Sequence, residues 1–192
     1  MRRKVFDVLV SAGGLVVVVV LVVAGALLMW AQSFTSSSVH NQLAQQQIYF
    51  PPAAAFAHAK AGTEITPGMK PYLLQYAGQE LLTGAQAEAY ADHFIAVHLS
   101  EMPYGGVYAT ISGKALANPN DASLKALEQV SFQGTTLRGL LLEAYAFGTF
   151  GTIALFAGIA AFALAALMLV LVLFGFWHSR RIPDSAELLA PS

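Results

Sequence analysis

Two histidines, His93 and His98, are the residues whose type and spacing come nearest to a metal-binding pattern. They are five positions apart, which places them about 140° apart around an α-helix. Zinc-binding histidines on one helix usually sit four positions apart, on one face. Carboxylates stand nearby at Glu88, Asp92 and Glu101, but no two histidines and one carboxylate have the spacing of a non-haem iron site. We therefore expect no metal ligands, and a structural or solvated role for both histidines.

The sequence also lacks the motifs of the other common chemistries. It has no cysteine, which excludes thiolate catalysis and cysteine-bound zinc. It contains no G-x-S-x-G, S-x-x-K or Walker motif. A net charge of −1, without a basic patch, argues against binding to nucleic acid. We expect no catalytic residues and no cofactor, and we predict that the protein is not an enzyme.

Two long uncharged stretches dominate a chain that is 56% hydrophobic and 11% charged. About 20 apolar residues are enough to cross the hydrocarbon core of a bilayer. We predict one transmembrane helix at 8–31 and a second within 144–177, which crosses the membrane at about 151–177 and continues outside it. The first stretch runs on through Trp30, beyond the roughly 7–15 apolar residues of a signal peptide. We therefore expect it to be retained.

Basic residues flank the two stretches, at 2–4 before the first and at 180–181 after the second. Lysine and arginine near a membrane span mark its cytoplasmic side. We predict a multi-pass plasma-membrane protein with both termini, 1–7 and 178–192, in the cytoplasm. Residues 32–143 then form an extracytoplasmic domain.

The sequence of this domain predicts helices, so the expected fold class is an all-α membrane protein with two transmembrane helices flanking the domain. Thr83 and Gln86 have the spacing of a capping box. Asn120 or Asp121 is placed to cap a second helix, which we expect to end at Gly134 before another helix enters the second span. The stretch from Tyr104 to Pro119 contains strand-forming residues without a partner strand, and we predict a helix there as well.

The stretch HNQLAQQQIYFPP, at 40–52, joins the first span to the domain. Its glutamines carry no catalytic pKa and are poor metal ligands. Tyr49 and Phe50 are placed to pack on the domain before Pro51 stops the helix. We interpret the stretch as a juxtamembrane stalk rather than a binding site.

Small residues recur at intervals of four in the second span. They are Ala154 and Gly158, and Ala157, Ala161 and Ala165. The first span offers Gly13, Gly14, Ala24 and Gly25. Such residues let helix backbones approach closely in a membrane. We expect them to pack either between the two spans or against another protein, in a homo-oligomer or a larger membrane complex.

Four segments together, HNQLAQQQIYFPP, AFAHAKAGTEITP, TLRGLLLEAYAFGTFG and LFGFWHSRR, resemble a family of two-pass membrane proteins from actinobacteria. The resemblance covers residues 1–181. Members of that family often carry the description "aromatic ring-opening dioxygenase", alpha subunit. The resemblance implies a helical outer domain and a plasma-membrane location, and it supplies no catalytic residues.

The function that these features favour is structural or accessory: a protein held in the lipid bilayer that presents a small helical domain for interaction with other proteins. An alternative is an extracytoplasmic ligand-sensing module that acts through a partner. A third, less favoured, is a metal-dependent ring-cleaving dioxygenase, for which the sequence shows no iron-binding pattern.

Overall fold

The computed structural model describes residues 2–183 and 186. Every regular element within these residues is a helix, which confirms the predicted all-α fold. The chain divides into two compact units. One unit, which we call the helix pair, contains the described residues up to Phe34 and from Gly151 onward. The other, which we call the intervening domain, runs from Thr35 to Phe150.

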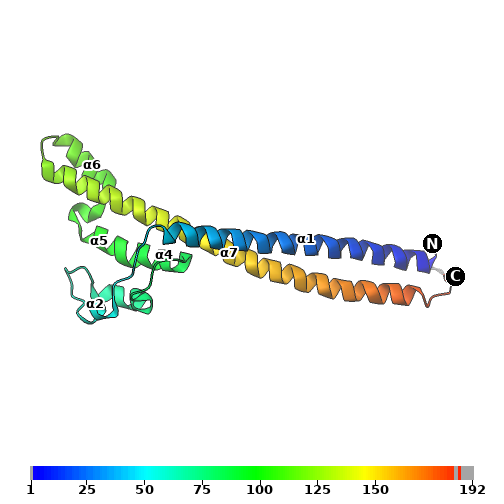
Figure 1. Ribbon diagram of the computed structural model, residues 1–192. Helices are drawn as coiled ribbons and strands as arrows, with labels where there is room; N and C mark the ends of the chain where they lie inside the picture. Colours follow the sequence, from blue (N-terminus) through cyan, green and yellow to red (C-terminus); the bar gives the residue numbers. More distant parts are fainter. Residues whose placement is uncertain (1, 184–185, 187–192) are drawn as a thin grey trace. The chain divides into compact units, whose positions relative to one another are not determined.

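The helix pair is built from parts of the two longest helices, α1 (Arg3–Ala44) and α7 (Ala122–Ser179). Residues 3–34 of α1 and 151–179 of α7 run antiparallel and side by side, so that the start of α1 and the end of α7 lie at the same end of the pair (Figure 1). Both helices are long and apolar enough to cross a membrane. Only 17% of the most apolar window of α1 and 11% of that of α7 are buried, unlike a helix in the core of a soluble protein.

Buried residues of the helix pair recur at every seventh position of each helix. In α1 they are Ser11, Val18 and Gly25, and in α7 they are Gly151, Gly158, Ala165, Val172 and Ser179; Ala161, between two of these positions, is buried as well. A seven-residue period keeps one seam of each helix facing its neighbour along the whole contact. Most residues of the seam are small, which allows the two backbones to approach closely.

Glycines of the seam have no room for a side chain. A Cβ added to Gly14 would lie 2.7 Å from Cγ2 of Val172, and one added to Gly25 would lie 3.0 Å from the ring of Phe162. A Cβ on Gly175 would overlap the hydroxyl of Ser11. The close packing of the two helices therefore depends on these glycines.

Of the five small residues that the sequence analysis named in the second apolar stretch, four are at least partly buried and one is exposed. Gly158, Ala161 and Ala165 are buried in the seam and Ala154 is half-buried, whereas Ala157 is exposed. In the first span, Gly14, Ala24 and Gly25 face inward to different degrees, but Gly13 is exposed and has nothing within 4 Å of an added Cβ. Packing between α1 and α7 thus occupies most of the expected interface.

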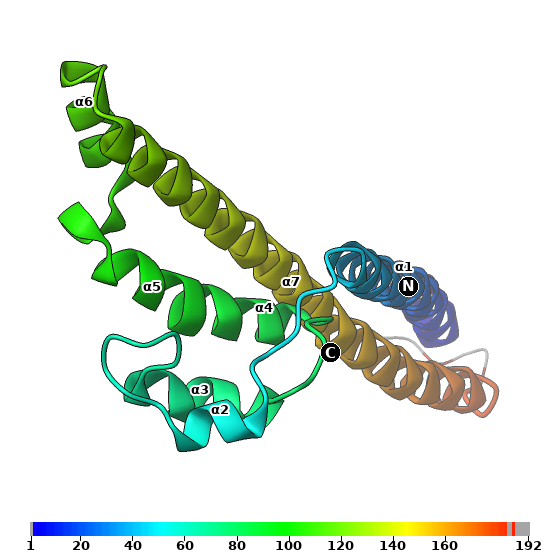
Figure 2. The same cartoon turned by 60° about the vertical axis from the view of Figure 1, so that its left-hand side comes forward.

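The intervening domain consists of short helices beside the first part of α7 (Figure 2). In chain order they are α2 (Ala53–Ala57), the 3₁₀ segment η1 (Pro67–Met69), α3 (Lys70–Leu73), the 3₁₀ segment η2 (Leu74–Tyr76), α4 (Gly84–Tyr90), the π-helical segment η3 (Ala91–Ile95), α5 (Ala96–Glu101), the 3₁₀ segment η4 (Pro103–Gly106) and α6 (Tyr108–Ala117). Its apolar core includes Leu43, Phe50, Phe56, Met69, Leu73, Leu81, Ile95 and Leu141.

Two predicted helix starts are confirmed. The hydroxyl of Thr83 accepts a hydrogen bond from the Gln86 amide, and Oε1 of Gln86 accepts one from the Thr83 amide at 3.0 Å, which completes the capping box. Asp121 precedes α7, and its Oδ1 accepts hydrogen bonds from the amides of Ser123 and Leu124 at 2.9 and 3.1 Å. Each cap satisfies amides that have no partner within the helix.

The expected helix end at Gly134 is wrong. Helix α7 continues without a break from Ala122 to Ser179. A Cβ on Gly134 would lie 2.8 Å from Cδ2 of Leu99. Gly134 therefore lies within α7 and leaves room for the side chain of Leu99 from α5. Its small size rather than its flexibility explains its presence.

The predicted helix after Gly106 is confirmed as α6, in which Ile111 is fully buried and Tyr108 contacts Phe132 of α7. A hydrogen bond joins the turn before α6 to α7: the hydroxyl of Ser131, a fully buried residue, donates to the Gly106 carbonyl at 2.7 Å. Gly106 has a φ of 64°, and a Cβ there would overlap the Leu99 carbonyl. Only glycine fits this turn, since other residues rarely adopt positive φ.

Candidate functional site

The two histidines of the sequence analysis do not converge on a common site. The ring of His93 stacks on that of Tyr72, with centroids 3.4 Å apart and planes at 4°. Nδ1 of His98 hydrogen-bonds with the carbonyl oxygen of Phe94 at 2.7 Å. Both rings therefore serve in packing within the domain. Of the residues considered with them, Glu101 is exposed to solvent.

Asp92, the carboxylate nearest to His93 in the sequence, is engaged elsewhere. Its Oδ1 accepts a hydrogen bond from the Arg138 guanidinium at 2.6 Å, which joins η3 to α7. The side chains are 37% and 40% exposed, so the surrounding water weakens this ion pair. Within residues 2–183 and 186, no group of three or more histidine, aspartate or glutamate residues is placed to hold a metal ion.

A small pocket lies where the chain leaves α1 and passes α4. It has a volume of about 290 Å³. Its lining residues are Tyr49, Phe50, Pro51, Pro52, Ala55, Glu64, Ile65, Tyr90 and Phe94. They come from the segment before α2, from α2 itself, from the loop that follows it, and from α4 and η3. Four aromatic rings, two proline rings and one carboxylate thus meet around one space.

The aromatic rings of this pocket also contact one another. Phe50 is 2% exposed and meets Tyr90 edge to face, with centroids 5.4 Å apart. Tyr90 stacks on Phe94 at 4.6 Å. Burial raises the pKa of the Tyr90 phenol, and the negative charge of Glu64 raises it further. The Tyr90 phenol therefore remains protonated at neutral pH and is available as a hydrogen-bond donor.

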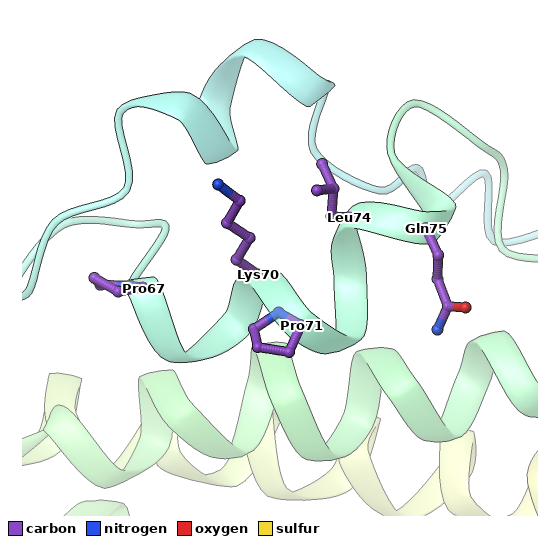
Figure 3. Close-up of a pocket in the computed structure, with 5 residues that line it drawn as sticks. All are labelled: Pro67, Lys70, Pro71, Leu74 and Gln75. Atoms are coloured by element: carbon purple, nitrogen blue, oxygen red, sulfur yellow. The ribbon is translucent and has the colours of Figure 1, made fainter.

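A second hollow lies along η1, α3 and η2 and has a volume of about 590 Å³. Figure 3 shows the side chains that line it, of which Lys70 and Gln75 are the polar ones. All five lining residues are exposed to solvent. No buried side chain lines this open hollow, whereas Phe50 and Ile65, which line the aromatic pocket, are buried. The aromatic pocket is therefore the stronger candidate.

Comparison of the chain with known proteins finds no similarity on which a function could be based: no family model matches it, and no curated protein or solved structure matches it.

The sequence analysis did not identify the aromatic pocket. Part of it, Tyr49 to Pro52, lies in the stretch that we interpreted as a stalk. The feature of the sequence that could have indicated the pocket is the aromatic pair Tyr49 and Phe50 followed by Pro51 and Pro52, because rigid rings in a connecting segment can line a binding site. The remaining rings, Tyr90 and Phe94, resemble ordinary helix-packing residues at a spacing of four, and nothing in the sequence distinguishes them from a core stripe.

Proposed function

We infer that this is a two-pass plasma-membrane protein of structural or accessory type, which presents its intervening domain outside the cytoplasm for interaction with other proteins. The observation that best supports this proposal is the apolar outer surface of the helix pair. Large apolar side chains there stay exposed, including Val16, Leu27, Trp30, Phe156 and Leu167. Apolar surface of this extent needs a lipid or protein environment, and the lengths of α1 and α7 suit a bilayer.

The ends of the helix pair support the proposed orientation. Arg3 and Lys4 at the start of α1 and Arg180 and Arg181 after α7 lie at the same end of the antiparallel pair. The Arg181 guanidinium lies 3.8 Å from the centre of the Trp177 ring. Tryptophan and arginine together are typical of a membrane interface, and clustered basic residues favour its cytoplasmic side.

The intervening domain carries an exposed apolar surface that suits a protein partner. We call it the hairpin patch, and it consists of Val107 just before α6, Tyr108 and Leu116 on α6, and Phe132 near the start of α7. Leu116 is 79% exposed, and the rings of Tyr108 and Phe132 contact each other with centroids 5.5 Å apart. Exposed apolar side chains that contact each other, as Tyr108 and Phe132 do, mark interaction surfaces more often than isolated ones do.

Affinity purification of the full chain in mild detergent, followed by mass spectrometry, tests the accessory role. We expect a reproducible partner set that the Leu116→Glu variant loses, because a charge in an apolar interface is costly to desolvate. Gln133→Glu, at an exposed polar position beside the hairpin patch, is the matched control and keeps the partners. A protein that purifies alone, or a partner set unaffected by Leu116→Glu, would contradict the proposal.

A second candidate function is favoured by the aromatic pocket: a ligand-sensing module that acts through a partner. The pocket brings apolar rings together with the Tyr90 phenol and the Glu64 carboxylate. Aromatic side chains combined with a few convergent polar groups are typical of a small-molecule site.

A further inference from the structure

We propose that the aromatic pocket between Tyr49 and Tyr90 binds a small organic cation that carries a methylated ammonium group. This inference rests on the second candidate function and names its ligand class. The volume of about 290 Å³ is just below the roughly 300–1,000 Å³ of typical ligand sites, so the ligand is small.

The lining favours a cation over a neutral or anionic ligand. Tyr49, Phe50, Tyr90 and Phe94 contribute aromatic rings, whose faces carry negative electrostatic potential and attract ammonium groups. Glu64 is the only ionised side chain among the nine lining residues, and no lysine or arginine lines the pocket. An anion would face the Glu64 carboxylate without a compensating positive charge. The effect of Glu64 on the Tyr90 pKa indicates that its negative field reaches the pocket.

A methylated ammonium group fits this lining better than a primary one. A primary ammonium has three N–H donors that each need an acceptor when it leaves water, and among the nine lining side chains only those of Tyr49, Glu64 and Tyr90 carry an oxygen atom. A quaternary ammonium has no N–H donor. Its methyl groups can contact the rings of Pro51, Pro52 and Tyr49 while its charge interacts with the aromatic faces.

The walls of the pocket are held by backbone hydrogen bonds. On one side, the amide of Phe50 donates to the Gln79 carbonyl at 2.9 Å, and the amide of Gly78 donates to the Pro51 carbonyl at 3.1 Å. These bonds fix the aromatic and proline rings of the chain segment before α2. Rings that are already in place lose little conformational entropy when a ligand binds.

The loop that carries Glu64 is held in a similar way. The amide of Lys60 donates to the Ile65 carbonyl at 3.0 Å. The hydroxyl of Thr63 lies 2.7 Å from the Lys60 carbonyl and 2.9 Å from the Ile65 carbonyl, and can donate to either. The side chain of Ile65 is buried. The loop thus presents the carboxylate from a closed turn rather than from a loose connection.

Isothermal titration calorimetry on the full chain in phosphatidylglycerol nanodiscs tests the proposal. The probes are choline and its neutral carbon isostere 3,3-dimethyl-1-butanol, which has the same shape without the charge. We expect choline to bind at one site and the isostere to bind at least tenfold more weakly. Equal binding of the two would overturn the cation assignment and leave ligand binding intact, whereas binding of neither would overturn the ligand-sensing function as well.

Two variants locate the site. Tyr49 is 58% exposed, so Tyr49→Leu removes a ring without opening the core, and we expect choline affinity to fall about two- to fivefold. Glu64→Lys places a positive charge at the pocket, and we expect choline binding to fall by more than Tyr49→Leu causes. The controls are Tyr72→Leu and Glu101→Lys, at exposed positions that do not line the pocket. Unchanged affinity in both pocket variants would overturn the proposal.

The ligand could be free in solution or could be a phospholipid headgroup with the same ammonium chemistry. Repeating the titration in nanodiscs that contain phosphatidylcholine distinguishes the two sources. Loss of free choline binding there assigns the site to the headgroup, and unchanged binding assigns it to a soluble cation.

Discussion

Gly158 of α7 packs directly on Gly25 of α1: a Cβ added to Gly158 would lie 3.4 Å from the carbonyl oxygen of Gly25, and 3.1 Å from the sulfur of Met29. Helices pack this closely only where both carry small residues. The seven-residue recurrence of buried positions extends this contact in both directions along the pair. The face of α7 that includes Ala157 remains exposed and is free of this contact.

Enlarging a seam residue should separate the two helices. Ala161 is 8% exposed, so Ala161→Leu forces a larger side chain into a filled contact, which typically costs about 1–3 kcal/mol. We expect a lower thermal midpoint of unfolding in mild detergent, measured by circular dichroism.

Ala157→Leu is the matched control, because it makes the same change one turn away at an exposed position. We expect the control to shift the stability by less than about 0.5 kcal/mol. If Ala157→Leu were the more damaging of the two, the exposed face of α7 would instead be the packed one.

Two glycines within α7 should respond differently to the same substitution. Gly139 has nothing within 4 Å of an added Cβ, whereas a Cβ on Gly148 would lie 3.2 Å from Cα of Gly84 in α4. Gly139→Ala should stabilise the protein by about 1 kcal/mol, the helix preference of alanine over glycine. Gly148→Ala should not increase the stability in this way, because the α4 and α7 backbones must move apart to make room for the added methyl group. Chemical or thermal unfolding of both variants checks this, and an equal rise in stability would show that α4 does not pack closely there.

The start of α7 should depend on pH. The Ser123 hydroxyl, followed by the Leu124 and Ser123 amides, hydrogen-bonds the Asp121 carboxylate and holds its pKa below the usual value. A lowered pKa means that this stabilisation is present above the ordinary pKa of about 4. It is lost as the pH falls through the folded-state pKa.

Asp121→Asn provides the comparison for this titration, because asparagine also caps helices but does not ionise. We expect the thermal midpoint of the native protein to fall relative to that of Asp121→Asn as the pH is lowered from 7 to 3. A constant difference between the two proteins across this range would show that Asp121 does not stabilise α7 through its charge.

Local patterns predicted those parts of the fold that depend on neighbours in the sequence. The capping box of Thr83 and Gln86 and the cap at Asp121 involve residues within three positions of each other, so their spacing alone indicates them. The two apolar stretches could be predicted from composition alone. The helix α6 could be predicted because its strand-forming residues have no partner strand nearby.

Contacts between distant residues explain what the sequence could not predict. Gly134 resembles a helix terminator, but Leu99 of α5 packs against it and α7 continues. The π-helical segment η3 places Asp92 against Arg138, and no local pattern indicates that pair. The aromatic pocket likewise joins Tyr49 to Tyr90 across four intervening helical segments. Such arrangements depend on how the helices pack, which one sequence does not reveal.

Cysteine accessibility in intact cells tests most directly whether the two long helices cross a membrane with both ends inside. The chain has no cysteine, so each substitution introduces a single thiol. We expect a membrane-impermeant maleimide to label Ala117→Cys, at the end of α6, in intact cells. Val5→Cys and Pro183→Cys should be labelled only after the cells are permeabilised. Labelling of Val5→Cys or Pro183→Cys from outside, or protection of Ala117→Cys, would contradict the account.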